Sequence, residues 1–195
     1  MLAAADAGAA APWRGIYTES GAERLFQPCG GGTRLNVSGG SAKDDLGSIY
    51  SVLAARGGGR VYVELRGRRR GNALHVAALE RVQPGAAGCA EVLRNTLFNA
   101  FGTSPDWNVY IDPAGIRLRT LADGLLPAFP YRRYRRQGEA WVFDTANANG
   151  ILRVELHRLR CIDADSGGRF GFSAEVSHGE RKFSGCAYAG ALFRD

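Results

Sequence analysis

The chain has 195 residues, of which 45% are hydrophobic and 23% charged, and its formal net charge is +6. This composition is ordinary for a soluble globular protein, and the length suits one large domain or two small ones. No apolar run approaches the roughly 18 residues that a membrane-spanning helix needs, which excludes such a helix.

The first segment, residues 1–12, reads MLAAADAGAAAP. It has neither the positive n-region nor the long apolar h-region of an intact signal peptide. We therefore expect a flexible, Ala-rich tether, such as the stretch that follows a removed signal or lipid-anchor sequence. Any membrane association would then depend on that removed anchor.

Residues 13–91 begin with a strand pattern. Strands are expected over 13–20 and 22–29, with a hairpin turn at Ser20-Gly21 between them, and a third strand over 33–39.

A helix should follow these strands, because Leu46, Ile49 and Leu53 recur at helical spacing, with Asp44 as its N-cap and Gly57 as its stop signal.

Two more strands complete this half of the chain. Val61, Val63 and Leu65 alternate along the first of them, the chain turns through Gly67–Gly71, and the second follows. Three strands, a helix and two strands is the element order of the OB-fold, a five-stranded Greek-key barrel. The sequence predicts such a barrel over residues 13–91.

A turn-rich stretch, Gln83–Cys89, marks the boundary to a second domain over residues 92–195. Strands are expected there over 97–101, 107–111, 115–121, 140–144, 150–159, 170–177 and 181–188. The predicted fold is therefore all-β with one short helix: an OB-fold-like barrel followed by a second antiparallel β-barrel or sandwich.

Four cysteines form an early pair, Cys29 and Cys89, and a late pair, Cys161 and Cys186. No CxxC is present, and no histidine lies near them at metal-ligand spacing. The even count favours two disulfides, one in each domain, and the alternative is four unrelated buried thiols. Disulfides would indicate an oxidising compartment: the bacterial periplasm, the cell surface or the medium.

The first half resembles the OB-fold domain of NlpE-like envelope lipoproteins, over about residues 13–91. The resemblance is carried by a G-x-Y opening at Gly15 and Tyr17 and by F-x-x-C at Phe26 and Cys29. The CxxC of copper or redox sensing belongs to a different domain of that family and is absent here, so no copper role is implied.

The second half resembles a family of uncharacterised bacterial envelope proteins, over about residues 95–190. It has their opening F-x-A-x-G-x-x-P-x-W, here Phe98, Ala100, Gly102, Pro105 and Trp107. It also has their ending C-x-D-x-x-S-G…G-C. The resemblance supports the cysteine pairing and implies that Gly102–Trp107 is a corner between two strands, with Trp107 in the core. A Trp that begins an alternating strand is also more often a core residue than a binding-site residue.

The departures from that second family lie inside the turn. Thr103 and Ser104 replace the family's Asn-Glu, and Asp106 replaces its Phe, so no role of that Glu carries over.

Catalytic and metal motifs are missing. His75, His157 and His178 belong to no HxH or HExxH, and no GxSxG occurs, so we expect no enzyme, cofactor or metal. Asp163, Asp165 and Ser166 crowd oxygens into one turn that lacks EF-hand spacing. An Asx-type turn is the simpler interpretation.

Two arginine clusters are the candidate binding residues. Each has four members: Arg66, Arg68, Arg69 and Arg70; and Arg132, Arg133, Arg135 and Arg136. OB-folds often bind ligands through the loop between strands four and five, and arginines suit anionic groups. In an envelope compartment we expect no nucleic acid, but an envelope protein or an anionic head-group surface. A solvated basic turn is the alternative.

The leading hypothesis is therefore a non-enzymatic recognition or stress-sensing protein, a periplasm-facing lipoprotein. An inhibitor or immunity protein that caps a cell-wall hydrolase or secreted effector is the second hypothesis. A small-ligand carrier is the third.

Overall fold

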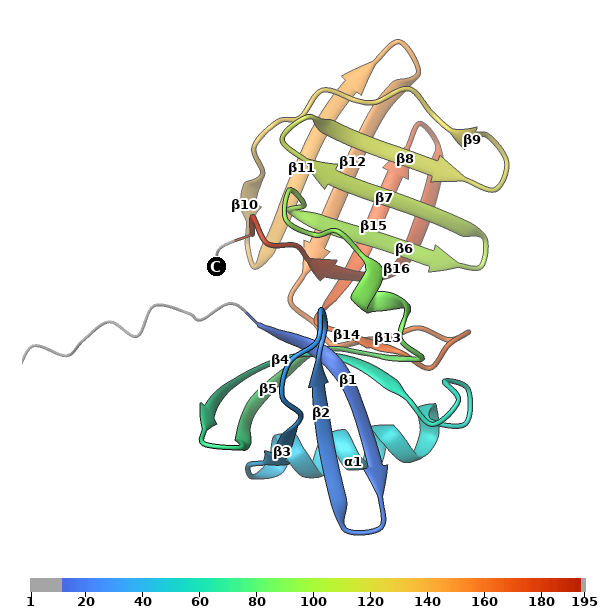
Figure 1. The fold of residues 1–195 in the computed structure, drawn as a ribbon. Helices are drawn as coiled ribbons and strands as arrows, with labels where there is room; N and C mark the ends of the chain where they lie inside the picture. The colour runs from blue at the N-terminus through green and yellow to red at the C-terminus, as the bar shows by residue number, and fades with distance from the viewer. Residues whose placement is uncertain (1–11, 194–195) are drawn as a thin grey trace, which may run out of the picture.

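The computed structural model describes residues 12–193 and arranges them as two β-sheets, one above the other in Figure 1. The predicted tether over residues 1–12 lies outside the described residues, apart from Pro12. The described chain contains one α-helix, α1 (Ser41–Leu53), and one short 3₁₀ turn, η1 (Ala87–Ala90). The predicted all-β class with one short helix is confirmed.

The first sheet closes into a five-stranded barrel. Its strands are β1 (Trp13–Ser20), β2 (Glu23–Pro28), β3 (Leu35–Ser38), β4 (Val61–Arg70) and β5 (Ala73–Pro84). β1 pairs antiparallel with β2 and β4, β2 with β3, and β3 runs parallel to β5, while the β4–β5 pairing closes the ring. With α1 between β3 and β4, this is the predicted OB-fold arrangement.

The period-two pattern of the strands produces the barrel core. Tyr17, Phe26, Leu35 and Leu74 are buried inside it, and α1 closes one end with Leu46, Ile49 and Leu53. Burial of these side chains is the main favourable term for the barrel.

The helix does not begin where the sequence analysis placed it. α1 starts at Ser41, after Gly40 at the N-cap, and no side chain caps it. Asp44, the predicted cap, lies instead in the first turn, where its negative charge suits the helix dipole. The backbone N–H of Gly57 donates to the Leu53 carbonyl, so this glycine lies in the turn that follows the helix.

The predicted turn through Gly67–Gly71 is also shorter than expected. β4 continues to Arg70, and the hairpin turns at Gly71 and Asn72, with Gly71 at a φ of 58°. Register shifts after Glu64 and Arg66 keep the two long strands paired. The arginines therefore belong to a strand and not to a loop, because bulges absorb the extra residues without ending the ladder.

The second sheet has nine strands in the order β10-β11-β12-β15-β16-β6-β7-β8-β9. They are β6 (Phe98–Thr103), β7 (Asp106–Asp112), β8 (Gly115–Thr120), β9 (Gly124–Leu125), β10 (Arg135–Gln137), β11 (Ala140–Asn147), β12 (Gly150–His157), β15 (Phe172–His178) and β16 (Arg181–Ala189). β9 and β10 are too short to have been predicted.

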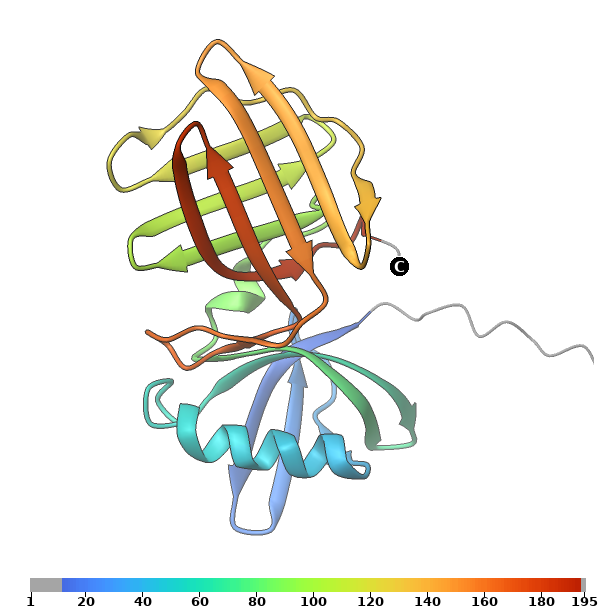
Figure 2. The same ribbon diagram turned by 180° about the vertical axis from the view of Figure 1, so that it is seen from behind.

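β16 joins two layers of this second sheet. It pairs with β15 through residues 181–187 and with β6 through residues 186–189. β6, β7 and β8 thereby cross in front of β11, β12 and β15 (Figure 1; the reverse side is in Figure 2). Aromatic side chains, among them Phe98, Trp141 and Phe172, fill the space between the layers.

The stretch FGTSPDW forms the β6–β7 hairpin. Gly102 pairs with Trp107 and Thr103 with Asp106, and a cis peptide bond precedes Pro105 in the turn. The Trp107 ring is 1% exposed and lies 5.9 Å from the Phe183 ring. A Cβ on Gly102 would stand 2.3 Å from the Trp107 indole nitrogen, so only glycine leaves room for this ring.

A second hairpin links the two sheets. β13 (Cys161–Ile162) and β14 (Arg169–Phe170) belong by sequence to the second domain, yet β14 pairs with β5 of the barrel. The predicted strand over 170–177 is accordingly split at Gly171 into β14 and β15. The expected boundary near residue 91 separates the two sheets except for this crossing hairpin.

Both predicted disulfides are present, Cys29–Cys89 and Cys161–Cys186, and no described cysteine is free. The second disulfide joins the two sheets, because Cys161 is in β13 of the first sheet and Cys186 is in β16 of the second. Two disulfides indicate an oxidising, extracytoplasmic environment.

Candidate functional site

The first arginine cluster lies on β4, where it pairs with β5. Arg66 pairs across the ladder with Ala78 and Arg68 with His75. The Arg66 guanidinium lies 2.5 Å from the Glu80 carboxylate.

Towards the tip of the hairpin, Arg68, Arg69 and Arg70 are exposed, and within residues 12–193 no carboxylate comes within ion-pair distance of them. The Arg69 side chain donates to the Gly71 carbonyl, 2.9 Å away. The hairpin therefore carries three uncompensated positive charges.

The second cluster lies before and within β10. Arg135 is neutralised by Asp144 at 2.9 Å, and Arg136 stacks on Trp141 with its guanidinium carbon 4.1 Å from the ring centre. Arg132 and Arg133 are exposed, and no ion pair joins either of them to another described residue. Within the described residues, only Arg135 of this cluster has a carboxylate partner.

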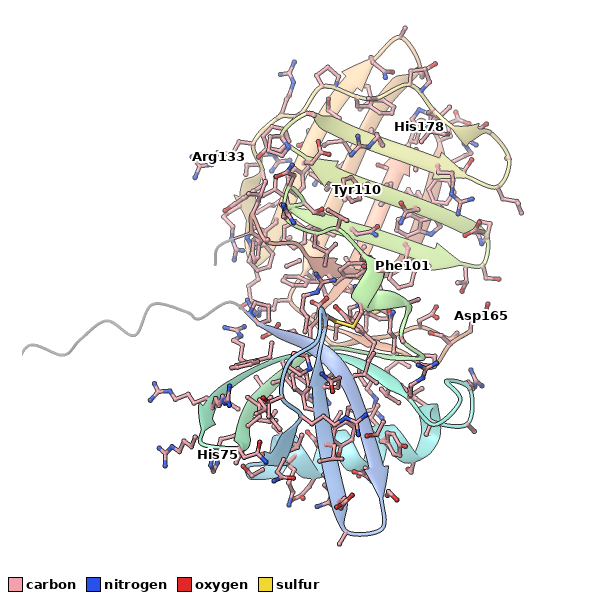
Figure 3. The ribbon with its side chains drawn as sticks, viewed as in Figure 1. His75, Phe101, Tyr110, Arg133, Asp165 and His178 are labelled. Carbon is pink, nitrogen blue, oxygen red and sulfur yellow. A yellow bond between two sulfur atoms is a disulfide. The ribbon has the colours of Figure 1, made fainter. Side chains whose placement is uncertain are left out.

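The two clusters face the same side of the molecule. Figure 3 labels His75 on the β4–β5 hairpin and Arg133 near β10, and both lie on the side at which β1 begins. Figure 2 shows the same placement from behind. The fold thus gathers two positive segments that are more than sixty residues apart in the chain on one side.

Arg81 lies at the interface between the two sheets and is 2% exposed. We call this interface, with Arg81, Glu64, Glu91 and Tyr188, the seam. The Arg81 guanidinium forms a two-pronged ion pair with Glu91 at 2.6 and 2.8 Å and donates to Gln83. The ring of Tyr188 lies face-on, 3.7 Å from the guanidinium carbon. These partners come from both domains, so the seam is a specific, fully bonded contact.

Glu64 is the second buried charge of the seam. It lies 3.5 Å from both Arg81 and Arg14 and accepts a 2.5 Å hydrogen bond from the Tyr62 hydroxyl. Burial raises the pKa of Glu64, although Arg81, Tyr62 and Arg14 oppose this shift. Burial alone would lower the pKa of Arg81, but its hydrogen bonds to Glu91 raise it, so Arg81 stays charged.

The histidines are scattered and do not form a site. His75 is exposed, while His178 is buried and bonded to the Asn149 carbonyl at 2.8 Å. His157 lies at the end of β12. No three metal-binding side chains come together anywhere in residues 12–193.

The acidic turn has the Asx-type geometry. One carboxylate oxygen of Asp163 accepts hydrogen bonds from both the backbone N–H and the hydroxyl of Ser166, at 2.9 and 2.5 Å. The Asp165 carbonyl accepts a bond from Arg56 of the barrel domain, which ties this turn to the first domain.

The sequence analysis missed the arginines at the junction. Arg158, Arg160 and Arg169 line a pocket together with Arg66 and Glu80. The run LHRLRC does show Arg158 and Arg160 as a basic pair, but only the crossing hairpin brings Arg169 to them.

Comparison with protein-family models, with curated proteins and with solved structures finds no match. None of the helices within the described chain is long and apolar enough to cross a membrane.

Proposed function

We propose that this protein is a non-enzymatic recognition protein of the bacterial cell envelope, a lipoprotein facing the periplasm. The two disulfides support an extracytoplasmic site of action. The resemblance of both halves to envelope proteins supports the envelope in particular. Its partner would be an acidic envelope protein or an anionic head-group surface.

The observation that carries this proposal is the tip of the β4–β5 hairpin. Arg68, Arg69 and Arg70 are exposed and have no carboxylate partner within residues 12–193. Neighbouring like charges repel one another, so folding gains nothing evident from this arrangement. An anionic partner would relieve the repulsion, and guanidinium groups suit carboxylate and phosphate.

The test compares two triple variants of equal charge. The hairpin variant replaces Arg68, Arg69 and Arg70 with Ser, which removes the three hairpin charges that have no carboxylate partner. The control variant replaces Arg117, Arg119 and Arg181 with Ser, which removes three arginines that already have carboxylate partners and belong to neither cluster. Both lower the net charge from +6 to +3, which is 6 minus 3.

Binding is measured to vesicles containing an anionic phospholipid and to proteins captured from an envelope fraction. The hairpin variant should lose binding and the control variant should keep it. Wild-type binding should fall as salt shortens the screening length from about 10 Å at 0.1 M to about 3 Å at 1 M. The proposal is wrong if the wild type binds neither target, or if both variants bind like the wild type.

A further inference from the structure

A pocket lies at the junction of the barrel and the second sheet, with a volume of about 270 Å³. Its polar wall comes from three separate segments of the chain. Arg66 and Glu80 belong to the β4–β5 ladder, Arg158 and Arg160 follow β12, and Arg169 is in β14. Ile49, Leu79 and Val82 form an apolar wall.

The charges of this pocket do not balance. Five arginines and one glutamate line it, a charge of +4, from 5 minus 1. One of the five, Arg81, is already paired with Glu64 and Glu91, which do not line the pocket. Glu80 is shared, because it lies 2.5 Å from Arg66 and 3.7 Å from Arg158. For Arg160 and Arg169, no carboxylate in the described part of the chain is within ion-pair distance.

Several other arginines of the second domain do have carboxylate partners. Arg119, Arg153 and Arg181 each have a carboxylate within 2.9 Å. An unbalanced cluster in a concave, partly desolvated place is costlier than one on a convex surface, because less water screens it. A bound anion would therefore relieve the repulsion between these arginines.

Two of the pocket arginines lie next to fixed points of the fold. Arg160 directly precedes Cys161, which is bonded to Cys186. Arg169 is held by the pairing of β14 with β5, opposite Val82. Groups that are already in position lose little conformational entropy when a ligand arrives, which favours binding.

We propose that this pocket binds the phosphoryl group of an organic phosphate. A phosphoryl group carries up to two negative charges and several acceptor oxygens, which can take hydrogen bonds from two or three guanidinium forks at once. The apolar wall of Ile49, Leu79 and Val82 would contact the organic part. The ligand is a soluble phosphate ester or the head group of a phospholipid.

This site is separate from the surface in the proposed function. Arg68, Arg69 and Arg70 do not line the pocket. The pocket could therefore bind its ligand even if the hairpin has no partner, and the two proposals fail independently.

The test uses the full chain and two probes, glycerol 3-phosphate in calorimetry and phosphatidylglycerol vesicles in co-sedimentation. The variant is Arg160→Gln with Arg169→Gln. It should weaken binding by about tenfold for each guanidinium removed, which matches the loss of one charge-assisted hydrogen bond. The control is Arg119→Gln with Arg181→Gln, which removes equal charge elsewhere and should bind like the wild type.

Binding of glycerol 3-phosphate that is lost in the pocket variant supports a soluble ligand. Binding to vesicles alone, lost in the same variant, supports a lipid head group. The single variant Arg160→Gln, at an exposed position, provides the same comparison if the double variant is unstable. The proposal is overturned if the wild type binds neither probe at low salt, or if the pocket and control variants weaken binding equally.

Discussion

The core of the second sheet and the seam between the two sheets are both buried, but their chemistry is opposite. The core is built from aromatic and aliphatic side chains such as Phe98, Trp107 and Phe143. The seam places Arg81 and Glu64, 2% and 3% exposed, among tyrosines. Apolar burial is non-directional, whereas a buried charge requires each of its partners in place. The core thus supplies stability, and the seam determines how the two domains meet.

The largest effect should come from the core. Trp107→Ala removes a ring that is 1% exposed and should lower the free energy of unfolding by about 5 kcal/mol, the upper part of the range for such changes. Urea denaturation followed by circular dichroism measures this loss. Leu121→Ala, at a residue 73% exposed, is the control and should change little. A stable Trp107→Ala protein would mean that the second sheet does not depend on this ring.

The seam should respond nearly as strongly, for a different reason. Arg81→Ala leaves Glu91 without its ion-pair partner and leaves Glu64 with Arg14 alone, and it should cost about 3–4 kcal/mol. Replacing both carboxylates as well, with Arg81→Met, Glu64→Gln and Glu91→Gln, should recover part of that loss, because no carboxylate of the seam is left without a partner and Arg14 keeps its hydrogen bonds to Tyr62 and Gly88.

The same urea titration measures both seam variants, and Arg119→Ala is the matched control. Arg119 pairs with Asp106 at the surface, so its loss should cost about 0.2–1 kcal/mol. Equal effects of Arg81→Ala and Arg119→Ala would show that burial of the seam does not matter.

A third prediction concerns the disulfide that joins the two regions. Cys161→Ala with Cys186→Ala opens a loop with a sequence separation of 25. It should lower stability by about 3 kcal/mol on the chain-entropy account. Hydrogen exchange should become faster in β14 than in β11 and β12, because the hairpin loses its covalent tie to β16. Unchanged protection of β14 would show that its pairing with β5 is sufficient.

The smallest effect is the pH dependence of stability that Glu64 contributes in the seam. The raised pKa of Glu64 means that the folded protein binds more protons than the unfolded chain, from the ordinary glutamate pKa of about 4.3 up to the raised value. Glu64 therefore adds to the free energy of unfolding at pH values below this range, and the added stability is lost as pH rises from the ordinary pKa through the raised one.

Glu64→Gln does not titrate, so the stability of the wild type minus that of this variant should fall as pH rises. Urea unfolding of both proteins at several pH values measures this difference. A difference that increases with pH would mean that the ion pairs with Arg81 and Arg14 outweigh burial and lower the pKa of Glu64.

Much of the fold follows from local patterns along the chain. The alternation at Val61, Val63 and Leu65 and the helical spacing of Leu46 and Ile49 report which side of each element faces a core. Glycine-rich turns and the order of elements then leave few topologies. The OB-type barrel, the pairing of the cysteines and the all-β second domain could therefore be predicted from the sequence.

The arginines of the candidate sites could be predicted from the sequence, but their partners could not. Arginine runs are visible in the sequence, so the hairpin arginines Arg68, Arg69 and Arg70 were found. Whether an arginine has a partner depends on cross-strand neighbours, which is why Arg135 could not be distinguished from Arg132. The short edge strand β10 has no recognisable pattern of its own, because three residues are fewer than a period-two pattern needs.

Local patterns along the chain predict the inside of each domain, whereas long-range packing fixes how the two domains meet. By their alternation, Glu64 and Arg81 belong to the outer face of the barrel, where charges are ordinary. They are buried because the hairpin β13–β14 and Tyr188 cover them. Non-local pairing such as that of Arg169 with Val82 has no local signal, since it depends on segments more than eighty residues apart arriving at one place. The arginine pocket exists for the same reason.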